Sequence, residues 1–220
     1  MIKPLQETSL MEVINKPRRG RPKKSATEGM DTRESLLRAG MSMLTESGFS
    51  QSGIDPILKS VGVPKGSFYY YFSSKEAFGL AVLARYRRYF EAKLDGFLLD
   101  DAFSPLERLQ RFALDAQDGM ARHDFKRGCL VGNLEQESSL LSEAFQQALQ
   151  DTYASWQFRV AICLQEAKKQ QLMAENSQID RLAQVFWMGW EGAVHRARLE
   201  KSSQPLSVFI DFYLGAIQRN

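Results

Sequence analysis

The stretch that decides the fold of this chain runs from residue 53 to residue 75 and reads GIDPILKSVGVPKGSFYYYFSSK. Its first apolar residues, at positions 54, 57, 58 and 61, have the spacing of one buried helix face. Gly62-Val63-Pro64 is a turn signal, and a second short helix rich in Lys, Ser and Tyr follows it. Two short helices joined in this way are typical of a helix-turn-helix, whose second helix presents hydrogen-bonding side chains to a DNA groove.

The composition is that of a globular protein from a reducing compartment. Among 220 residues, 44% are hydrophobic and 25% are charged. No run approaches the ~20 apolar residues of a membrane span, and the N-terminus lacks the apolar stretch of a signal peptide. The two cysteines, Cys129 and Cys163, form no disulfide framework. We therefore expect a cytoplasmic protein without a membrane partner.

Positive charge is concentrated near the N-terminus. Six of the 29 basic residues lie between residues 16 and 24, leaving 23 basic against 26 acidic residues elsewhere. This placement favours an arm that binds phosphate groups. Within it, Arg19-Gly20-Arg21-Pro22 resembles an AT-hook core, which predicts that Arg19 and Arg21 enter a narrow minor groove. The alternative is a solvated basic tail with non-specific affinity for phosphate.

Nearly all of the chain after residue 30 has helical periodicity, which predicts an all-α fold. We expect a flexible basic arm over 1–30, a three-helix DNA-binding bundle with the helix-turn-helix over 31–74, and a larger helical domain over 75–220. The expected helices cover about 31–47, 54–61, 65–72, 75–97, 105–120, 142–170, 178–201 and 206–218.

Local signals give finer expectations for some of these helices. Ser52 with Asp55, and Ser73 with Glu76, have the spacing of capping boxes at the starts of the second and fourth helices. The small residues Gly189, Ala193 and Ala197 share one face of the 178–201 helix. Small residues at this spacing predict a close approach of a neighbouring helix.

Several motifs resemble the Tet repressor family of bacterial transcription regulators. The stretch VPKGSFYYYFSSKE at 63–76 is similar to the family's DNA-recognition segment. The stretches RGCLVGNL at 127–134 and FWMGWEGA at 186–193 are similar to the subgroup that contains acrylate-responsive repressors, and the first also to electrophile-sensing repressors. The resemblance implies an all-helical homodimer that binds operator DNA through three N-terminal helices. It also implies that the larger domain holds an effector pocket and the dimer interface.

The recognition helix supplies most of the candidate DNA contacts. With Phe68 and Phe72 directed inward, the other side chains of the helix face outward, where Lys, Ser and Tyr can bind phosphates and base edges. The resemblance implies DNA contacts at Lys65, Ser67, Tyr69, Tyr71 and Lys75. The alternative, that the tyrosines are core residues, conflicts with the inability of one short helix to bury every face. The candidate DNA-binding residues are Arg19, Arg21, Ser52, Lys65, Gly66, Ser67, Tyr69, Tyr70, Tyr71 and Lys75.

The larger domain contains candidates for a small-ligand site, because such sites combine aromatic walls with a few polar groups. The candidates are Cys129, Asn133, Trp156, Trp187, Trp190 and Glu191. Glu191 lies among apolar residues and needs a partner, for which Arg196, Arg198 or a bound cation is available.

Other readings of these candidates stay open. The tryptophans have a second interpretation as bundle core. Cys129 follows His123, Lys126 and Arg127, whose charges would favour a reactive thiolate, whereas its apolar neighbours favour a packed thiol. Cys163 is expected in the core.

These features together predict a ligand-responsive transcriptional repressor. A dimer would bind a pseudo-palindromic operator, and a small effector, with acrylate or a related unsaturated compound as the best candidate, would release it. The rival is an architectural DNA-binding protein without effector control. An enzyme is not expected, because the chain has no nucleophile elbow, phosphate loop or paired carboxylates with fixed spacing. No cofactor and no metal site are expected, since the two histidines stand far apart without ligand spacing.

Overall fold

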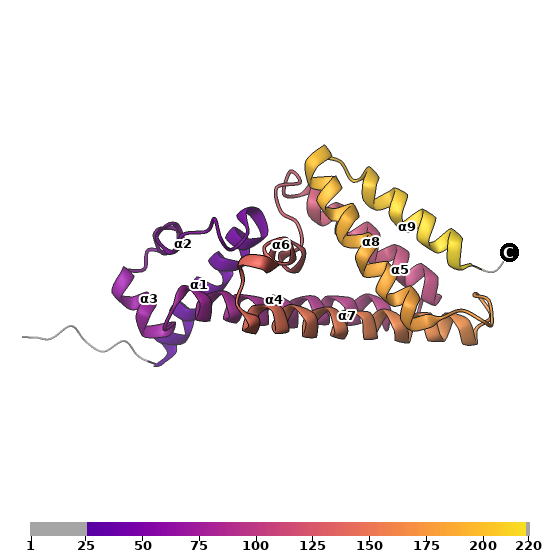
Figure 1. Cartoon of the computed structure of the whole chain (residues 1–220), viewed down its shortest axis with the longest axis horizontal. Coiled ribbons are helices and arrows are strands. Elements are labelled where there is room, and N and C mark those ends of the chain that lie inside the picture. Colours follow the sequence, from indigo (N-terminus) through magenta and orange to yellow (C-terminus); the bar gives the residue numbers. More distant parts are fainter. Residues whose placement is uncertain (1–25, 219–220) are drawn as a thin grey trace, which may run out of the picture.

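A computed structural model describes residues 26–218, and this part of the chain is all-α, as predicted (Figure 1). Within these residues no helix is long and apolar enough to cross a membrane. The helices are α1 (Ala26–Ser47), α2 (Ile54–Ser60), α3 (Lys65–Tyr71), α4 (Lys75–Leu98), α5 (Pro105–Ala121), α6 (Leu130–Gln136), the 3-10 helix η1 (Ser138–Leu140), α7 (Glu143–Lys169), α8 (Ile179–Glu200) and α9 (Gln204–Ile217).

Helices α1 to α3 form the N-terminal bundle, at one end of the elongated molecule (Figure 1). Their inward faces bury Leu36, Leu37, Leu44, Ile57, Leu58 and Phe68, whereas Ile54 and Val61, also predicted on the buried face of the second helix, are only partly buried. The bundle rests on the first turns of α4, because the ring of Phe78 lies 5.3 Å from that of Phe68 and 5.0 Å from that of Phe72. Recognition helix and long helix therefore share one aromatic cluster.

One helix start and two N-caps differ from the predictions. Helix α1 begins at Ala26 rather than residue 31, since extending an existing helix is far easier than nucleating one and 26–30 contain no proline. The Ser52–Asp55 capping box is absent: the N-cap of α2 is Gly53, which has no side chain to accept a hydrogen bond. Helix α4 is capped one residue later than expected, by Ser74, whose hydroxyl accepts from the Ala77 N–H.

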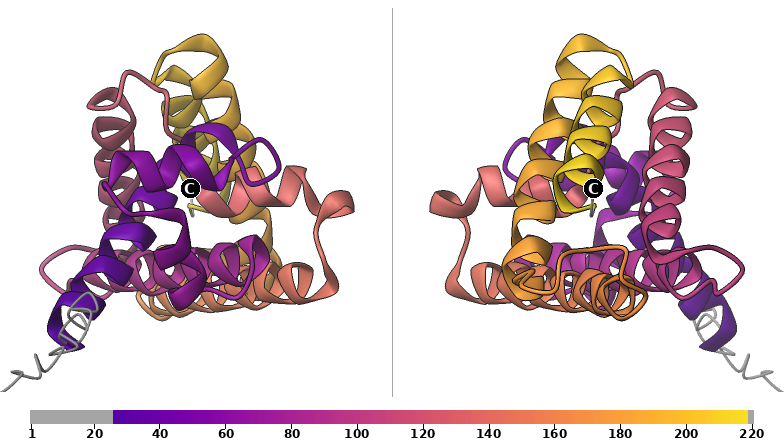
Figure 2. Two further views of the ribbon diagram at one scale, coloured as in Figure 1. Left: turned by 90° about the vertical axis from the view of Figure 1, so that its left-hand side faces the viewer. Right: turned by 90° about the vertical axis from the view of Figure 1, so that its right-hand side faces the viewer.

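The larger domain is built on two long helices, α4 and α7, which run side by side (Figure 1). Helix α5 and the α8–α9 pair rise from this layer (Figure 2). An aromatic cluster joins the layers, and the ring centroids of Trp156 on α7 and Trp187 on α8 are 4.8 Å apart. One face of α4 buries Phe78, Val82, Tyr86 and Leu94, and Phe90 and Phe97 are partly buried against the core.

The close helix approach predicted from small residues is present between α8 and α9. A Cβ atom added at Gly189 would overlap the ring of Phe209 on α9. Ala193 and Ala197 on the same face are buried. The small side chains therefore set the distance between these two helices.

Candidate DNA-reading surface and effector cavity

The outward face of α3 carries the polar and aromatic side chains expected of a DNA reader. Phe68 is fully buried and Phe72 nearly so, which turns the rest of the helix to the surface. Tyr69 is 52% exposed and Tyr70 is 82% exposed, so neither tyrosine is a core residue. Ser67 and Tyr71 are half-buried, whereas Lys65 and Gly66 are exposed.

The two lysines of this surface are already paired within the fold. Lys65 Nζ lies 3.0 Å from Asp55 Oδ1 on α2, and the hydrogen bond to this carboxylate raises the pKa of Lys65. Lys75 Nζ lies 4.6 Å from the ring centroid of Phe49 and donates to the carbonyl of Ser50. Both contacts are on the surface, where an ammonium group can exchange them for a DNA phosphate.

Ser52 is not a surface residue, which corrects its assignment as a DNA contact. Its side chain is buried, and its hydroxyl donates to the Gly48 carbonyl at 2.5 Å. Ser52 therefore stabilises the turn between α1 and α2 from inside. Arg19 and Arg21 lie outside the described residues.

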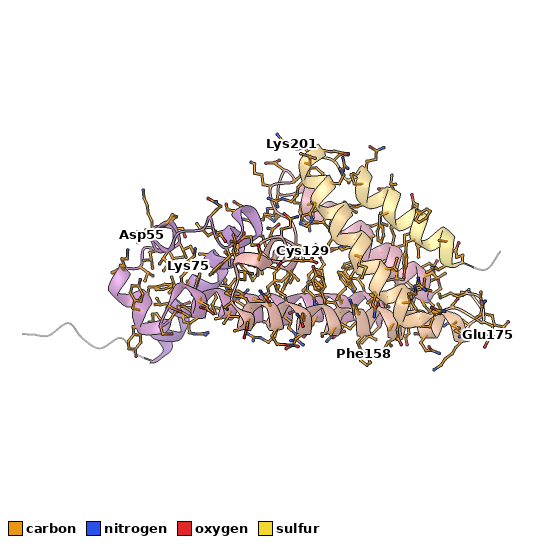
Figure 3. All side chains as sticks on the ribbon, viewed as in Figure 1. Asp55, Lys75, Cys129, Phe158, Glu175 and Lys201 are labelled. Atoms are coloured by element: carbon orange, nitrogen blue, oxygen red, sulfur yellow. The ribbon has the colours of Figure 1, made fainter. Side chains whose placement is uncertain are left out.

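A cavity of about 310 Å³ lies between the N-terminal bundle and the larger domain. Its apolar wall is largely aromatic, and four basic side chains line it without any carboxylate. Cys129, labelled in Figure 3, contributes from the segment that precedes α6. The lining residues include Arg38, Ser42, Thr45, Tyr86, Tyr89, Phe90, Lys93, Phe112, His123, Arg127, Gly128, Cys129 and Trp190.

Only two of the six predicted ligand residues, Cys129 and Trp190, line this cavity. Trp156 and Trp187 lie in the core, where Trp156 also packs on Phe90, a cavity residue, at 4.5 Å between ring centroids. Neither indole N–H has a hydrogen-bond partner among the described residues. These tryptophans support the cavity wall and do not line it.

Cys129 is a packed thiol and not the activated one that its basic neighbours suggested. Burial and the nearby Glu191 carboxylate raise the pKa of Cys129 well above its usual value. Arg127 is paired with Glu46 and Lys126 with Asp124, so these charges are partly neutralised. The Tyr86 hydroxyl lies 3.6 Å from the sulfur. Cys163 is in the core, as expected.

Glu191 has neither of the arginine partners proposed for it. Arg196 pairs with Glu200, and Arg198 binds Asn133 and the Glu46 carbonyl. Burial raises the pKa of Glu191 to about 7, against a smaller opposing effect of the Cys129 thiol. Neither of its oxygens accepts a hydrogen bond of normal geometry from the described residues. No group of three or more His, Cys, Asp or Glu side chains in that part of the chain could hold a metal ion.

The helix-turn-helix and the larger helical domain agree with the protein family that this chain matches. Residues 36–82 match the profile described as bacterial regulatory proteins, tetR family, and residues 105–213 match that of the tetracyclin repressor-like C-terminal domain. The transcriptional regulator AcuR of Cereibacter sphaeroides is 47% identical over 94% of this chain and 93% of its own length. The chain belongs to the tetR family. It is a transcriptional regulator and not an enzyme.

Further relatives from the tetR family share both halves of the chain. The repressor NemR of Escherichia coli strain K12 is 31% identical over 80% of this chain and 88% of its own length. A crystal structure of a regulatory protein TetR from Rhodobacter sphaeroides has a TM-score of 0.83 at 46% identity, covering 84% of this chain and 98% of that one. The resemblance proposed from the sequence motifs is confirmed.

The sequence analysis missed the contacts that join the two domains of this regulator. The Asn133 amide, predicted to bind ligand, instead donates to the Leu44 and Thr45 carbonyls at the end of α1. The Glu137 carboxylate accepts from the backbone N–H groups of Phe49 and Ser50, at 2.9 and 2.7 Å. The partners of Glu137 are almost 90 residues away in the chain, so no local pattern could have revealed them.

Proposed function

We propose that the protein is a ligand-responsive repressor that binds a pseudo-palindromic operator as a homodimer. In this proposal the exposed face of α3 enters the major groove of each half-site, and the basic arm of residues 16–24 adds phosphate or minor-groove contacts. Membership of the tetR family supports the DNA-binding part of the proposal. It also supports a place of action in the cytoplasm, where operator DNA is available.

The cavity supports effector control, because its lining residues come from both domains. Arg38, Ser42 and Thr45 belong to α1 of the DNA-binding bundle, whereas Phe112 and Trp190 belong to the larger domain. A ligand that fits one arrangement of the two domains better than another shifts the population toward it. This shared lining is the observation that carries the proposal.

The chemistry of the cavity favours a small organic acid as effector. Arg38, Lys93 and Arg127 line it and no carboxylate does, so the lining offers hydrogen-bond donors to an anion, although each of the three is ion-paired with a carboxylate that is not part of the lining. The aromatic wall formed by Phe90, Phe112 and Trp190 suits a short apolar or unsaturated chain. Acrylate and related unsaturated acids combine these two properties.

The outer face of α8 and α9 supports the homodimer. It exposes a series of large apolar side chains, of which Met188 is 71% and Phe212 is 75% exposed. A Cβ added at Gly192 or Gly215 would meet nothing within 4 Å. Apolar side chains beside such open glycines suit a second copy of the same face. Phe212→Lys is expected to give a monomer in light scattering, whereas the exposed-site control Phe158→Lys is expected to remain a dimer.

Fluorescence anisotropy of labelled DNA from the protein's own upstream region tests the regulatory proposal. The protein is titrated at two salt concentrations, and small acids, acrylate among them, are then added at saturating protein. We expect tight, salt-dependent binding that at least one acid abolishes. Binding that no compound affects would contradict effector control and leave the architectural role.

A further inference from the structure

The segment from Arg127 to Glu137 holds the DNA-binding bundle through several polar contacts. Backbone groups make some of them, for example the Gly128 N–H to the Thr45 carbonyl at 3.2 Å. Arg127 makes the side-chain contact nearest the cavity: its Nε lies 2.8 Å from Glu46 Oε1, and its Nη2 donates to Ser42 Oγ. Both partners of Arg127 belong to α1.

Arg127 is also part of the cavity wall, and so is Ser42. Arg127 therefore contacts α1 through its guanidinium group and also belongs to the lining of the ligand space. The guanidinium group donates from Nε to Glu46 and from Nη2 to Ser42. Neither partner therefore accepts the two parallel hydrogen bonds that a carboxylate can form with arginine. A carboxylate in the cavity can offer that bidentate geometry.

We propose that Arg127 senses the effector: it binds the carboxylate of the acid and gives up its two partners on α1, Glu46 and Ser42. This inference rests on the proposed function, since it assumes an acid in the cavity. The existing ion pair is a weak competitor because both side chains are more than a third exposed, 36% for Arg127 and 42% for Glu46. The exchange involves no covalent step.

The exchange would loosen the end of α1 while leaving a backbone hinge in place. The contacts of Asn133 with the Leu44 and Thr45 carbonyls do not involve Arg127 and persist. The end of α1 leads directly into the turn and α2, which brace the recognition helix. Small rotations of the bundle about this hinge change the separation of two recognition helices in a dimer, and operator binding depends on that separation.

Lys93 provides a matched contrast, because it lines the same cavity. Its ammonium group pairs with Asp115, so that this ion pair joins α4 to α5 inside the larger domain. An acid that binds Lys93 therefore breaks no contact with α1. Lys93 is expected to contribute to affinity for the acid, and Arg127 to both affinity and release.

Two quantities test the inference in the full-length dimer: the affinity of the free protein for acrylate and propionate by calorimetry, and the factor by which saturating acid weakens operator binding. Glu46→Gln removes the charge from the contact that the acid must break and so weakens it. It is expected to bind acid at least threefold more tightly, and its release factor is expected to fall at least threefold. By linkage, its operator affinity without acid should fall as well.

Two further variants separate affinity from release. Lys93→Gln is expected to bind acid more weakly. At saturating acid, however, its operator affinity should fall by the same factor as that of the wild-type protein. Arg127→Gln is expected to lose at least tenfold in acid affinity and most of the release. If wild-type protein releases operator and Glu46→Gln matches it in both quantities, the exchange is refuted while the proposed function stands. If no acid binds or releases the wild-type protein, the proposed function fails together with this inference.

Discussion

Replacing Glu191 by glutamine is expected to remove a pH dependence from the stability of the fold. Burial raises the pKa of Glu191 from its usual 4.5 to about 7. Below pH 4.5 the carboxyl is protonated in both states and contributes no pH dependence. Between about pH 4.5 and 7 the unfolded chain releases the proton and the folded chain keeps it, so stability falls as pH rises. Above about pH 7 both states are ionised and the loss is constant.

The size of this effect follows from the shift. At about 1.4 kcal/mol for each tenfold change in the proton affinity, a rise of the pKa from 4.5 to about 7 corresponds to roughly 3 kcal/mol of lost stability well above pH 7. Because the group is already partly ionised in the unfolded chain at pH 5, the expected change between pH 5 and pH 8 is somewhat smaller, about 2–3 kcal/mol. The Glu191→Gln protein keeps a buried polar group but has no proton to release there.

Urea unfolding at pH 5, 6, 7 and 8 measures this difference, with protein concentration held constant because the stability of any self-associating protein depends on it. The stability of Glu191→Gln relative to wild type should rise by about 2–3 kcal/mol across the series. Glu200→Gln, at a partly exposed site on the same helix, is the matched control for the substitution itself. A gap between Glu191→Gln and wild type that is equal at all four pH values would refute the reasoning.

Three further changes follow from the same structure. The Cys129 thiol should react with iodoacetamide at pH 7.5 far more slowly than a free cysteine, because burial and a nearby carboxylate raise its pKa; mass spectrometry gives the rate, and one equal to the free thiol would contradict its packing. Gly189→Ala should lower the unfolding free energy by ~1–3 kcal/mol by crowding Phe209, whereas Gly96→Ala, with open space around it, should raise it by up to ~1 kcal/mol. Glu137→Gln weakens the charge-assisted hydrogen bonds to the backbone N–H groups of Phe49 and Ser50. The unfolding free energy from thermal unfolding should therefore fall by ~1–3 kcal/mol, and the affinity for operator measured by anisotropy should be weaker. Unchanged values would show that these bonds contribute little.

Helix periodicity allowed the all-α fold and the orientation of the recognition helix to be predicted. Phe68 and Phe72 are one turn apart, and their burial leaves Tyr69 and Tyr70 on the surface. The errors occurred at helix ends, where one residue changes the hydrogen bonds. Ser52 has the right type for an exposed cap, but the turn at Gly48 draws its hydroxyl inward.

The ligand site was predicted less well, because a cavity wall depends on which faces of different helices meet. Trp190 lines the cavity whereas Trp187, on the same helix, lies in the core. Residue type alone does not separate these two tryptophans. The sequence placed Arg127 beside Cys129 and indicated that its charge favours a reactive thiolate. In the structure its partners are instead Glu46 and Ser42.

Patterns that span a few turns of chain were enough to predict the helical fold, the DNA-reading helix and the family. The assembled fold sets the roles of Asn133, Glu137 and Arg127, since their partners on α1 and in the turn that follows it lie 81 to 89 residues away in sequence. It also decided the state of Glu191, whose pKa depends on helices packed around it. Burial and long-range pairing are properties of the assembled core and cannot be read from local spacing.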